Sequence, residues 1–597
     1  MSSQSRAERP PLKTLLVYLR PYRLGIAAGL VLVIVANLFQ VMPPLLIGKA
    51  IDQFYQPSPS WPTVQRYVVL LVVVALLMGA SRFGMRQLLN SISRRVENDI
   101  RAAYFDHLLQ LDAAFFAQTR TGDLMSRAVN DIGNIRQAIG PAVMYLVNTF
   151  AFTMAGLFVM LRIDVRLTLI ALIPMLLLGP VTLYFGRILH DRYEQISEQL
   201  SVLTTMVQEN LSGVRIVRAY VQEDAQKRDF NLLNEDYMQR NMALARIEAV
   251  FNPLLTFLAT TGVLLVFYVG GRHTMAGRIS VGNFVAFSQF VVMFTWPMIG
   301  LSWVTSLFQR GAASYGRLMT IMDQQPTVAP PTQPIRLGAI RGAIEFSNVS
   351  FCYPNTTRVV LSNVTFSIDA GQTAAIVGPT GSGKSTIVSL LTRRYDRTGG
   401  EITIDGVAIE KIAFDQLRTA ISVVPQDSFV FSETIAENIT LGLPPGREAG
   451  DTVERVAEIA KLDEAVSEFP MGYQTRLGER GVNLSGGQRQ RTTLARALAR
   501  DPRILVLDDA LSAVDTHTES GILQALRTVL NERTSLIISH RVTAVMNADV
   551  ILVLDRGRIV ERGTHAELVE KRGLYASLLR RQLLEEGLED TQSAVNQ

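Results

Sequence analysis

Cysteine is almost absent from this chain of 597 residues, which contains only Cys352. A single thiol excludes an intrachain disulfide and the clustered cysteines of a structural zinc site. A cleaved signal peptide is not expected either, because the polar segment Met1 to Pro10 has no apolar run. These absences indicate that the soluble parts face a reducing compartment and that any membrane insertion depends on a later apolar segment.

A strong charge of one sign is also missing, since 58 Lys and Arg stand against 53 Asp and Glu, a formal net charge of +5. The length exceeds what one hydrophobic core supports, so we expect two or more domains. Apolar residues make up 48% of the chain and concentrate before about residue 310. In that half the arginines cluster at the ends of apolar runs, as in the cytoplasmic loops of membrane proteins. The placement of arginines in cytoplasmic loops therefore accounts for the positive net charge, and no nucleic-acid partner is expected.

Six apolar stretches are long enough to cross a bilayer, which takes about 20 helical residues. They are residues 24–47, 67–89, 141–161, 167–188, 251–271 and 281–308. The links after the second and fourth stretches are long, rich in arginine and free of proline. We therefore place both links in the cytoplasm and expect the second to fifth spans to continue as helices beyond the membrane, for example over residues 66–109. Residues 11–22 predict either an interfacial helix or a plain helical lead-in to the first span.

The chain changes character after residue 308. A linker is indicated by Pro326, Pro330, Pro331 and Pro334. Beyond it, short β-rich runs alternate with helical patterns, which is typical of an α/β sheet. The expected strands are 344–349, 374–377, 504–507, 535–538 and 550–554. The acidic end of the chain, residues 584–597, is expected to fray.

A phosphate-binding loop follows the run 373–377 and precedes a helical pattern from residue 386. Its residues are Gly378, Pro379, Thr380, Gly381, Ser382, Gly383, Lys384 and Ser385, with Thr386 next to it. Glycines let backbone amides approach phosphates, and the helix N-terminus favours an anion. Lys384 is expected to reach the β and γ oxygens of ATP, and Ser385 to hold Mg²⁺. The apolar run 504–507 ends in Asp508, which matches a metal-facing Walker B acid.

The segment Leu484, Ser485, Gly486, Gly487 and Gln488 resembles the signature of ATP-binding cassette (ABC) proteins. Further matches to this family follow in its order: Tyr353, Gln426, Asp515 and His540. The resemblance implies that Tyr353 stacks on adenine, Gln426 lies at the metal and the attacking water, Asp515 lies in the loop at the dimer interface, and His540 contacts the γ-phosphate. Ser485 to Gln488 would then contact the ATP of a partner chain.

The resemblance extends to the first half of the chain. Phe115 to Arg127 and Glu209 to Glu223 look like the two cytoplasmic loops of ABC exporters, which hold short coupling helices that dock on nucleotide domains, partly on those of the partner. The expected fold is therefore an all-α transmembrane domain of six helices followed by an α/β P-loop domain. The domain boundaries would be 1–23 for the N-terminal segment, 24–325 for the transmembrane domain, 326–342 for the linker, 343–583 for the cassette and 584–597 for the acidic tail.

One residue departs from the family pattern. The Walker B Asp is normally followed by Glu, the base that activates water, but here it is followed by Asp509. The shorter side chain withdraws the carboxylate by about 1 Å, a displacement that can slow catalysis on the order of 100-fold. The resemblance thus indicates one half of a heterodimeric multidrug exporter with one degenerate ATP site. Because Gln426 and His540 are unaltered, a slow homodimer remains an alternative.

The expected function is ATP-driven, Mg²⁺-dependent export of amphipathic drugs or lipids across the cytoplasmic membrane by an ATP-hydrolysing translocase in contact with membrane lipid. No fixed charge was found deep in a predicted span, which favours amphipathic over strongly ionic substrates. Four polar residues within the spans could line a cavity: Asn37, Gln40, Asn148 and Gln289. Four large apolar residues could offer an adaptable surface to a substrate: Phe290, Met293, Phe294 and Trp296. Packing between helices is an equally good explanation for both sets. A nucleotide-gated regulatory subunit shares every motif, whereas six spans argue against a soluble cassette ATPase.

Overall fold

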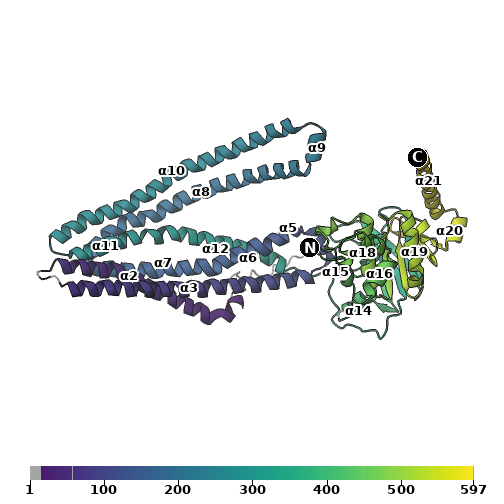
Figure 1. Ribbon diagram of the computed structural model, residues 1–597, viewed down its shortest axis with the longest axis horizontal. Coiled ribbons are helices and arrows are strands. Elements are labelled where there is room, and N and C mark those ends of the chain that lie inside the picture. Colours follow the sequence, from purple (N-terminus) through teal and green to yellow (C-terminus); the bar gives the residue numbers. More distant parts are fainter. Residues whose placement is uncertain are drawn as a thin grey trace. The chain divides into compact units, whose positions relative to one another are not determined.

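The computed structural model describes residues 15, 17–56, 58, 60–444, 446–447 and 449–595 (Figure 1). Contacts between residues divide the chain into two units. The first comprises the described residues of Met1–Leu109 together with Thr121–Gln324, and the second comprises Gln110–Arg120 with Gln325–Gln597. A short segment from the first half of the sequence therefore belongs to the second unit.

The first unit is helical throughout. After a 3₁₀ turn (Arg20–Tyr22), its helices are α2 (Arg23–Phe54), α3 (Trp61–Gln110), α5 (Thr121–Ser126), α6 (Ile132–Gln137), α7 (Val143–Ile163), α8 (Val165–Ser212), α9 (Val214–Ala219), α10 (Glu223–Met275), α11 (Val281–Met293) and α12 (Thr295–Met322). Two π-helical turns, Arg127–Asp131 and Ala138–Ala142, join α5, α6 and α7 into one rod. Figure 1 shows α8 and α10 lying side by side, with α9 joining their ends.

Five described helices are long and apolar enough to cross a membrane, which confirms the first five predicted spans. The helix expected over residues 66–109 is α3, and it is longer at both ends than predicted. Residues 11–14 and 16 of the segment 11–22 lie outside the described residues, and Arg20–Tyr22 form the 3₁₀ turn before α2, so the two alternatives for this segment stay open. The chain is a membrane protein with several spanning helices, as the sequence predicted.

The sixth predicted span, 281–308, is not one uninterrupted helix. A turn at Phe294 separates α11 from α12. Pro297 explains the break, because proline has no N–H to donate to the carbonyl of the preceding turn and its ring crowds that carbonyl. The span is therefore built from two helical pieces in sequence.

Small residues let the helices of the first unit approach closely. A Cβ atom on Gly282 of α11 would lie 1.9 Å from the carbonyl oxygen of Gly48 on α2. At the same place the Asp52 carboxylate accepts hydrogen bonds from the Ser280 hydroxyl (2.6 Å) and the Gly282 amide (2.7 Å). Close backbone contact backed by polar side chains is the usual way in which membrane helices associate.

Several residues considered for a substrate cavity pack between helices instead. The Asn37 amide donates to Asn148 Oδ1 at 3.0 Å, and Phe290 and Phe294 are completely buried. Arg82 donates to Gln40 Oε1 at 2.7 Å. Because Arg82 lies within the second predicted span, the expectation that the spans carry no fixed charge needs correction at this position. The contacts favour the helix-packing interpretation for these side chains.

The second unit holds two sheets. An antiparallel sheet has the order β2-β1-β4-β5, and a larger, mainly parallel sheet has the order β10-β9-β3-β8-β7-β6. The strands are β1 (Ile344–Cys352), β2 (Val359–Ile368), β3 (Thr373–Val377), β4 (Gly399–Ile404), β5 (Val407–Ala408), β6 (Ile421–Val424), β7 (Ile504–Asp508), β8 (Thr534–Ile538), β9 (Val550–Asp555) and β10 (Arg558–Gly563). All five strands predicted from the sequence are present.

The second unit also contains helices, and the labels of several can be followed in Figure 1. They are α4 (Ala113–Gln118), α13 (Lys384–Leu391), α14 (Phe414–Ala420), α15 (Ile435–Thr440), α16 (Thr452–Ile459), α17 (Asp463–Ser467), α18 (Gly486–Ala499), α19 (Thr516–Leu530), α20 (His565–Glu570) and α21 (Leu574–Val595). Of these, α13, α14, α18 and α20 contact the larger sheet. Continuous apolar strands such as β7 and β8, buried along their whole length, are what a parallel sheet covered on both faces requires. The predicted α/β fold is confirmed.

The C-terminal segment differs from its prediction. Residues 584–595 continue α21 and do not form an irregular tail. Leu, Glu, Gln and Ala, which dominate this segment, all favour helix, and this preference outweighs the acidic charge. The boundary placed at residue 583 therefore does not coincide with the end of an element.

Candidate nucleotide site

The phosphate-binding loop connects β3 with α13, the arrangement that its sequence predicted. Gly378, Gly381 and Gly383 have φ angles of 156°, 79° and 107°. A Cβ atom on Gly378 would also lie 2.0 Å from the carbonyl oxygen of Leu554. Glycine is required here because other residues resist both the left-handed backbone and the close approach.

Lys384 begins α13 and is only 6% exposed. Its ammonium group donates to the carbonyl oxygens of Gly378 (2.8 Å) and Pro379 (2.9 Å), so the side chain lies over the loop. Burial lowers the pKa of Lys384, while the nearby carboxylates of Asp509 and Asp508 oppose that effect. A buried cation on a loop of backbone amides is suited to bind a phosphate.

Ser385 and Asp508, the expected metal ligands, lie in contact. The Ser385 hydroxyl donates to Asp508 Oδ1 at 3.0 Å, which joins the start of α13 to the end of β7. Burial raises the pKa of the Asp508 carboxyl, and the neighbouring Asp509 raises it further, against the Ser385 hydrogen bond. A cation would relieve this unfavourable burial of negative charge. A hydroxyl beside a carboxylate is the oxygen donor set that Mg²⁺ prefers, so these residues fit that ion.

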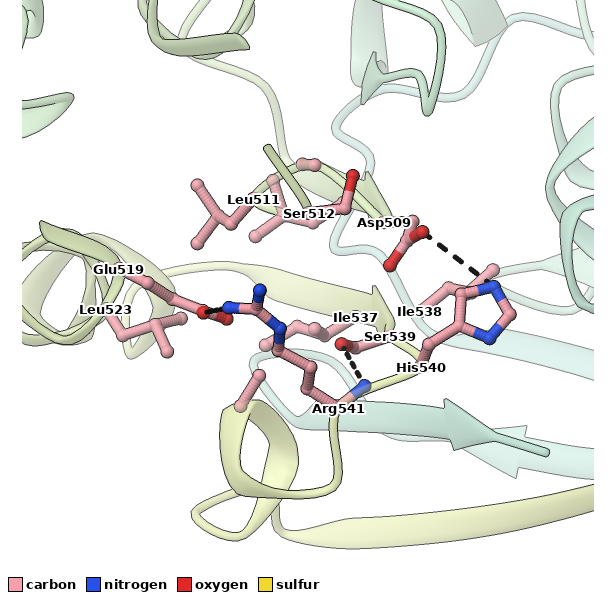
Figure 2. Close-up of a pocket in the computed structure, with 13 residues that line it drawn as sticks. Asp509, Leu511, Ser512, Glu519, Leu523, Ile537, Ile538, Ser539, His540 and Arg541 are labelled. Atoms are coloured by element: carbon pink, nitrogen blue, oxygen red, sulfur yellow. Dashed lines mark hydrogen bonds and ion pairs between the residues drawn. The ribbon is translucent and has the colours of Figure 1, made fainter. Parts of the chain in front are cut away.

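Asp509 lies near both of the other expected catalytic residues, and Figure 2 shows it beside His540. Gln426 Nε2 donates to Asp509 Oδ2 at 3.3 Å, and His540 Nε2 lies 3.8 Å from the same oxygen. Asp509 has a φ of 50°, and its amide donates to the carbonyl oxygen of Ile538 at 2.8 Å. The structure therefore brings the sequence-predicted Asp509, Gln426 and His540 together around one carboxylate.

Tyr353 lies beside the phosphate-binding helix. Its hydroxyl is 3.1 Å from the Thr386 hydroxyl, and its ring packs edge-on against Tyr395, with 5.3 Å between the ring centroids. An aromatic ring held at this position is suited to stack on a nucleobase. Tyr353 is thus joined to Thr386, the residue that directly follows the P-loop.

The signature segment lies at the start of α18. Ser485 and Gln488 form a capping box, in which each side chain accepts from the backbone amide of the other. The carboxylate of Asp515 caps α19 by accepting from the Thr518 amide at 2.8 Å, and no reciprocal bond is found between these two described residues. Within the part of the chain that the structure describes, no hydrogen bond or ion pair joins Ser485, Gly486, Gly487, Gln488 or Asp515 to the chain's own P-loop.

Two supporting residues, Gln490 and Arg541, were not identified from the sequence. Gln490 donates to the Ser512 hydroxyl (3.0 Å) and accepts from the Ala513 amide (2.9 Å), so it fastens the signature helix to the loop before Asp515. Arg541 forms an ion pair with Glu519 of α19 and lines a cavity of about 200 Å³ together with Asp509 and His540 (Figure 2). The position of Arg541 directly after His540 was the only sequence signal.

We expect Lys384→Ala to weaken nucleotide binding at this chain's own P-loop by at least about tenfold, because the phosphates lose a charge-assisted hydrogen bond. ATP affinity should be measured on the complete complex with the other site blocked. Lys411→Ala, which changes a lysine outside this site, is the control. Unchanged affinity of the Lys384 variant would show that this loop does not hold the phosphates.

Comparisons with known proteins agree with this site. Residues 26–298 match the ABC transporter transmembrane region family, and residues 361–512 match the ABC transporter domain family. The chain is 36% identical over 575 residues to the probable multidrug resistance ABC transporter ATP-binding/permease protein YheI of Bacillus subtilis, covering 96% of this chain and 98% of that protein. It is 35% identical over 572 residues to the multidrug resistance-like ATP-binding protein MdlA of Escherichia coli, covering 96% of both.

A third relative is named for a different function. The ATP-dependent lipid A-core flippase of Nitrosococcus oceani is 34% identical over 576 residues, covering 96% of this chain and 95% of the relative. Family matches in both halves of the chain and similarity along its whole length leave no ambiguity about its class. The chain belongs to the ABC transporter family, as an ATP-hydrolysing exporter subunit that joins a transmembrane domain to a nucleotide-binding domain.

Proposed function

We propose that this chain exports amphipathic small molecules, drugs or lipids, across the cytoplasmic membrane as one half of a dimer that uses ATP and Mg²⁺. The relatives named for multidrug resistance and for lipid A transport support this class of substrate. Tyr353, the P-loop residues 378–386, Asp508, Gln426 and His540 would form the nucleotide half-site. Ser385 and Asp508, with Gln426 nearby, would hold the metal ion.

One observation supports the proposal that a second chain is needed to complete the ATP site. The P-loop side of the site is assembled through direct contacts, whereas among the described residues the signature of the same chain makes no hydrogen bond or ion pair to it. This supports the proposal that the signature completes a site on another molecule. In the proposed dimer, Ser485 to Gln488 and Asp515 act on the ATP held by the partner's P-loop.

An exposed apolar tip at the end of α8 and α10 supports the same conclusion. We define the α9 tip as Ile216, Tyr220 and Val221, which are 65%, 74% and 80% exposed. Val221 also has a φ of 52°, a conformation that β-branched residues rarely adopt. Apolar side chains grouped at a cytoplasmic loop are typical of a protein contact, and we propose that this tip docks on the nucleotide domain of the partner.

We propose a heterodimer in which the site around Asp509 hydrolyses ATP slowly. The short carboxylate supports this proposal, since a base that is misplaced by about 1 Å acts poorly. The contacts that Asp509 keeps with Gln426 and His540 favour the second candidate, a slow homodimer. In both cases the chain would be a coupled exporter.

Transport itself can be tested in vesicles that contain the chain alone or together with a co-expressed homologue. We expect ATP-dependent accumulation of a fluorescent amphipathic dye at least about tenfold faster with the pair than with the lone chain, because only the pair would hold a complete site with a Glu base. Spin labels at Gly122 and the equivalent position of the partner should approach when ATP is trapped. Equal transport by the lone chain would favour the homodimer, and the absence of transport in both preparations would refute export.

A further inference from the structure

A single carboxylate, that of Asp112, collects hydrogen bonds from two distant parts of the sequence. Its Oδ1 atom accepts from the Phe115 amide at 3.2 Å and thereby caps α4. Its Oδ2 atom accepts from the Val328 amide at 3.0 Å and also from the amide and the hydroxyl of Thr327. Both partners lie in the same unit of the structure. We call the group formed by Asp112, Thr327 and Val328 the linker clamp.

The linker clamp holds its carboxylate in the charged form. Partial burial would raise the pKa of Asp112, but the hydrogen bonds from Thr327, Val328 and Phe115 outweigh it and hold the pKa below its usual value. Hydrogen bonds to an ionised carboxylate are roughly twice as strong as those between neutral groups. Four donors on one half-buried carboxylate thus make a strong local connection.

The linker continues from the clamp to the end of the phosphate-binding helix. The carbonyl oxygen of Ala329 accepts from Arg393 Nη2 at 3.3 Å. The Arg393 side chain is only 3% exposed, pairs with Asp396 and lies 4.6 Å from the centre of the Phe414 ring. Because Arg393 follows α13, the linker is attached to the helix that begins with Lys384 and Ser385.

Tyr395 lies near both Asp112 of the linker clamp and Tyr353, the residue expected to stack on the nucleobase. Its ring contacts Tyr353, and the nearby charge of Asp112 is one cause of the raised pKa of Tyr395, after burial and the Tyr353 hydroxyl. The linker is therefore connected through Arg393 to the end of α13, and Asp112 lies near Tyr395, which contacts Tyr353.

In the sequence, the residues of the linker clamp lie close to the ends of three helices of the membrane domain. Helix α3 ends at Gln110 and α5 begins at Thr121, so the segment that contains Asp112 joins two helices of the membrane domain. Helix α12 ends at Met322, shortly before Thr327. We propose that Asp112 is a positioning residue that makes the first coupling segment, the linker and the end of α13 move as one body. Movement of the phosphate-binding helix would then reach α3, α5 and α12 together, an inference that rests on the proposed ATP-driven export.

The first test compares Asp112→Ala with Asp106→Ala in the complete complex reconstituted in vesicles. Asp106 is exposed, and no hydrogen bond to its side chain is found among the described residues, so it is a matched control. For Asp112→Ala we expect basal ATPase within about twofold of the unmodified complex and dye transported per ATP at least about tenfold lower. Thr327→Val, which removes the hydroxyl donor but keeps both amides, should have a smaller effect.

Each outcome decides a separate question. Normal transport per ATP in Asp112→Ala would overturn the linker clamp while leaving export intact. If the unmodified complex hydrolyses ATP without transport, the proposed function fails independently of Asp112. Loss of ATPase in Asp112→Ala, with nucleotide affinity also lost, would show a role in folding of the unit and would likewise count against a positioning role.

The second test restores the connection by covalent means. The lone native cysteine is removed by Cys352→Ser, the partner's cysteines are replaced, and Asp112→Cys and Thr327→Cys are introduced together. Reduced, this variant should resemble Asp112→Ala; oxidised, it should regain at least half of the lost transport per ATP, because the disulfide replaces the clamp. Failure of the pair to cross-link, or continued uncoupling after cross-linking, would overturn the proposal.

Discussion

Replacing Gly487 with aspartate should lower ATP turnover of the assembled transporter by at least about 100-fold, comparable with the loss of one donor that stabilises a transition state. Gly487 lies at the N-terminus of α18, whose amides and dipole favour the negative phosphates of ATP. A carboxylate there would repel them. A Cβ atom would also lie 3.1 Å from the Ala513 carbonyl oxygen, so the loop that precedes Asp515 would have to shift.

This effect is expected at the partner's ATP, not at the chain's own P-loop. ATPase of the whole complex and ATP affinity at each site should be measured separately. Gly521→Asp is the control, because a Cβ atom at Gly521 meets nothing closer than the end of the Lys461 side chain at 4.0 Å. If Gly487→Asp weakened only its own site, the proposed exchange of signatures between chains would be wrong.

Removing the carboxylate of Asp509 should affect ATP turnover much less than removing that of the equivalent residue of the partner. In the proposed heterodimer, Asp509→Gln should reduce turnover of the complex by less than about twofold, whereas replacing the partner's Walker B Glu should nearly abolish it. Conversely, Asp509→Glu returns the missing methylene and should raise hydrolysis at this site by up to about 100-fold, because the carboxylate then reaches the attacking water.

The deciding measurement is ATPase of the purified lone chain, with and without Asp509→Gln. Robust activity that disappears with Asp509→Gln would exclude the heterodimer and establish the slow homodimer. Asn531→Gln, at the exposed end of α19, serves as a control for nonspecific losses. A negligible effect of Asp509→Glu would mean that carboxylate reach does not limit this site.

The sequence predicted most of the nucleotide site because its chemistry is local. Glycines at fixed spacing, a strand before them and a helix after them can be recognised without knowing the fold. The motifs and the family order indicated roles for Ser385, Asp508, Gln426 and His540, and the structure adds the contacts of Ser385 with Asp508 and of Gln426 and His540 with Asp509. The span positions followed from apolar length alone.

Contacts between distant, ordinary residues could not be predicted in this way. The bond from Thr327 to Asp112 joins residues whose types are common in loops, and neither has a motif of its own. The ion pair of Arg541 with Glu519 depends on how α19 packs beside β8. The break at Phe294 was missed because a hydropathy run does not register the effect of Pro297 on the helix hydrogen bonds.

The α9 tip also affects how the protein must be handled. In a subunit made without its partner, Ile216, Tyr220 and Val221 would be exposed to water, because detergent covers only the membrane helices. Attraction between apolar side chains is not screened by salt, so raising the ionic strength should not prevent clustering of such subunits. In the proposed heterodimer, simultaneous synthesis of both subunits would cover the tip, and we therefore expect balanced expression of the two chains to favour solubility as well as activity.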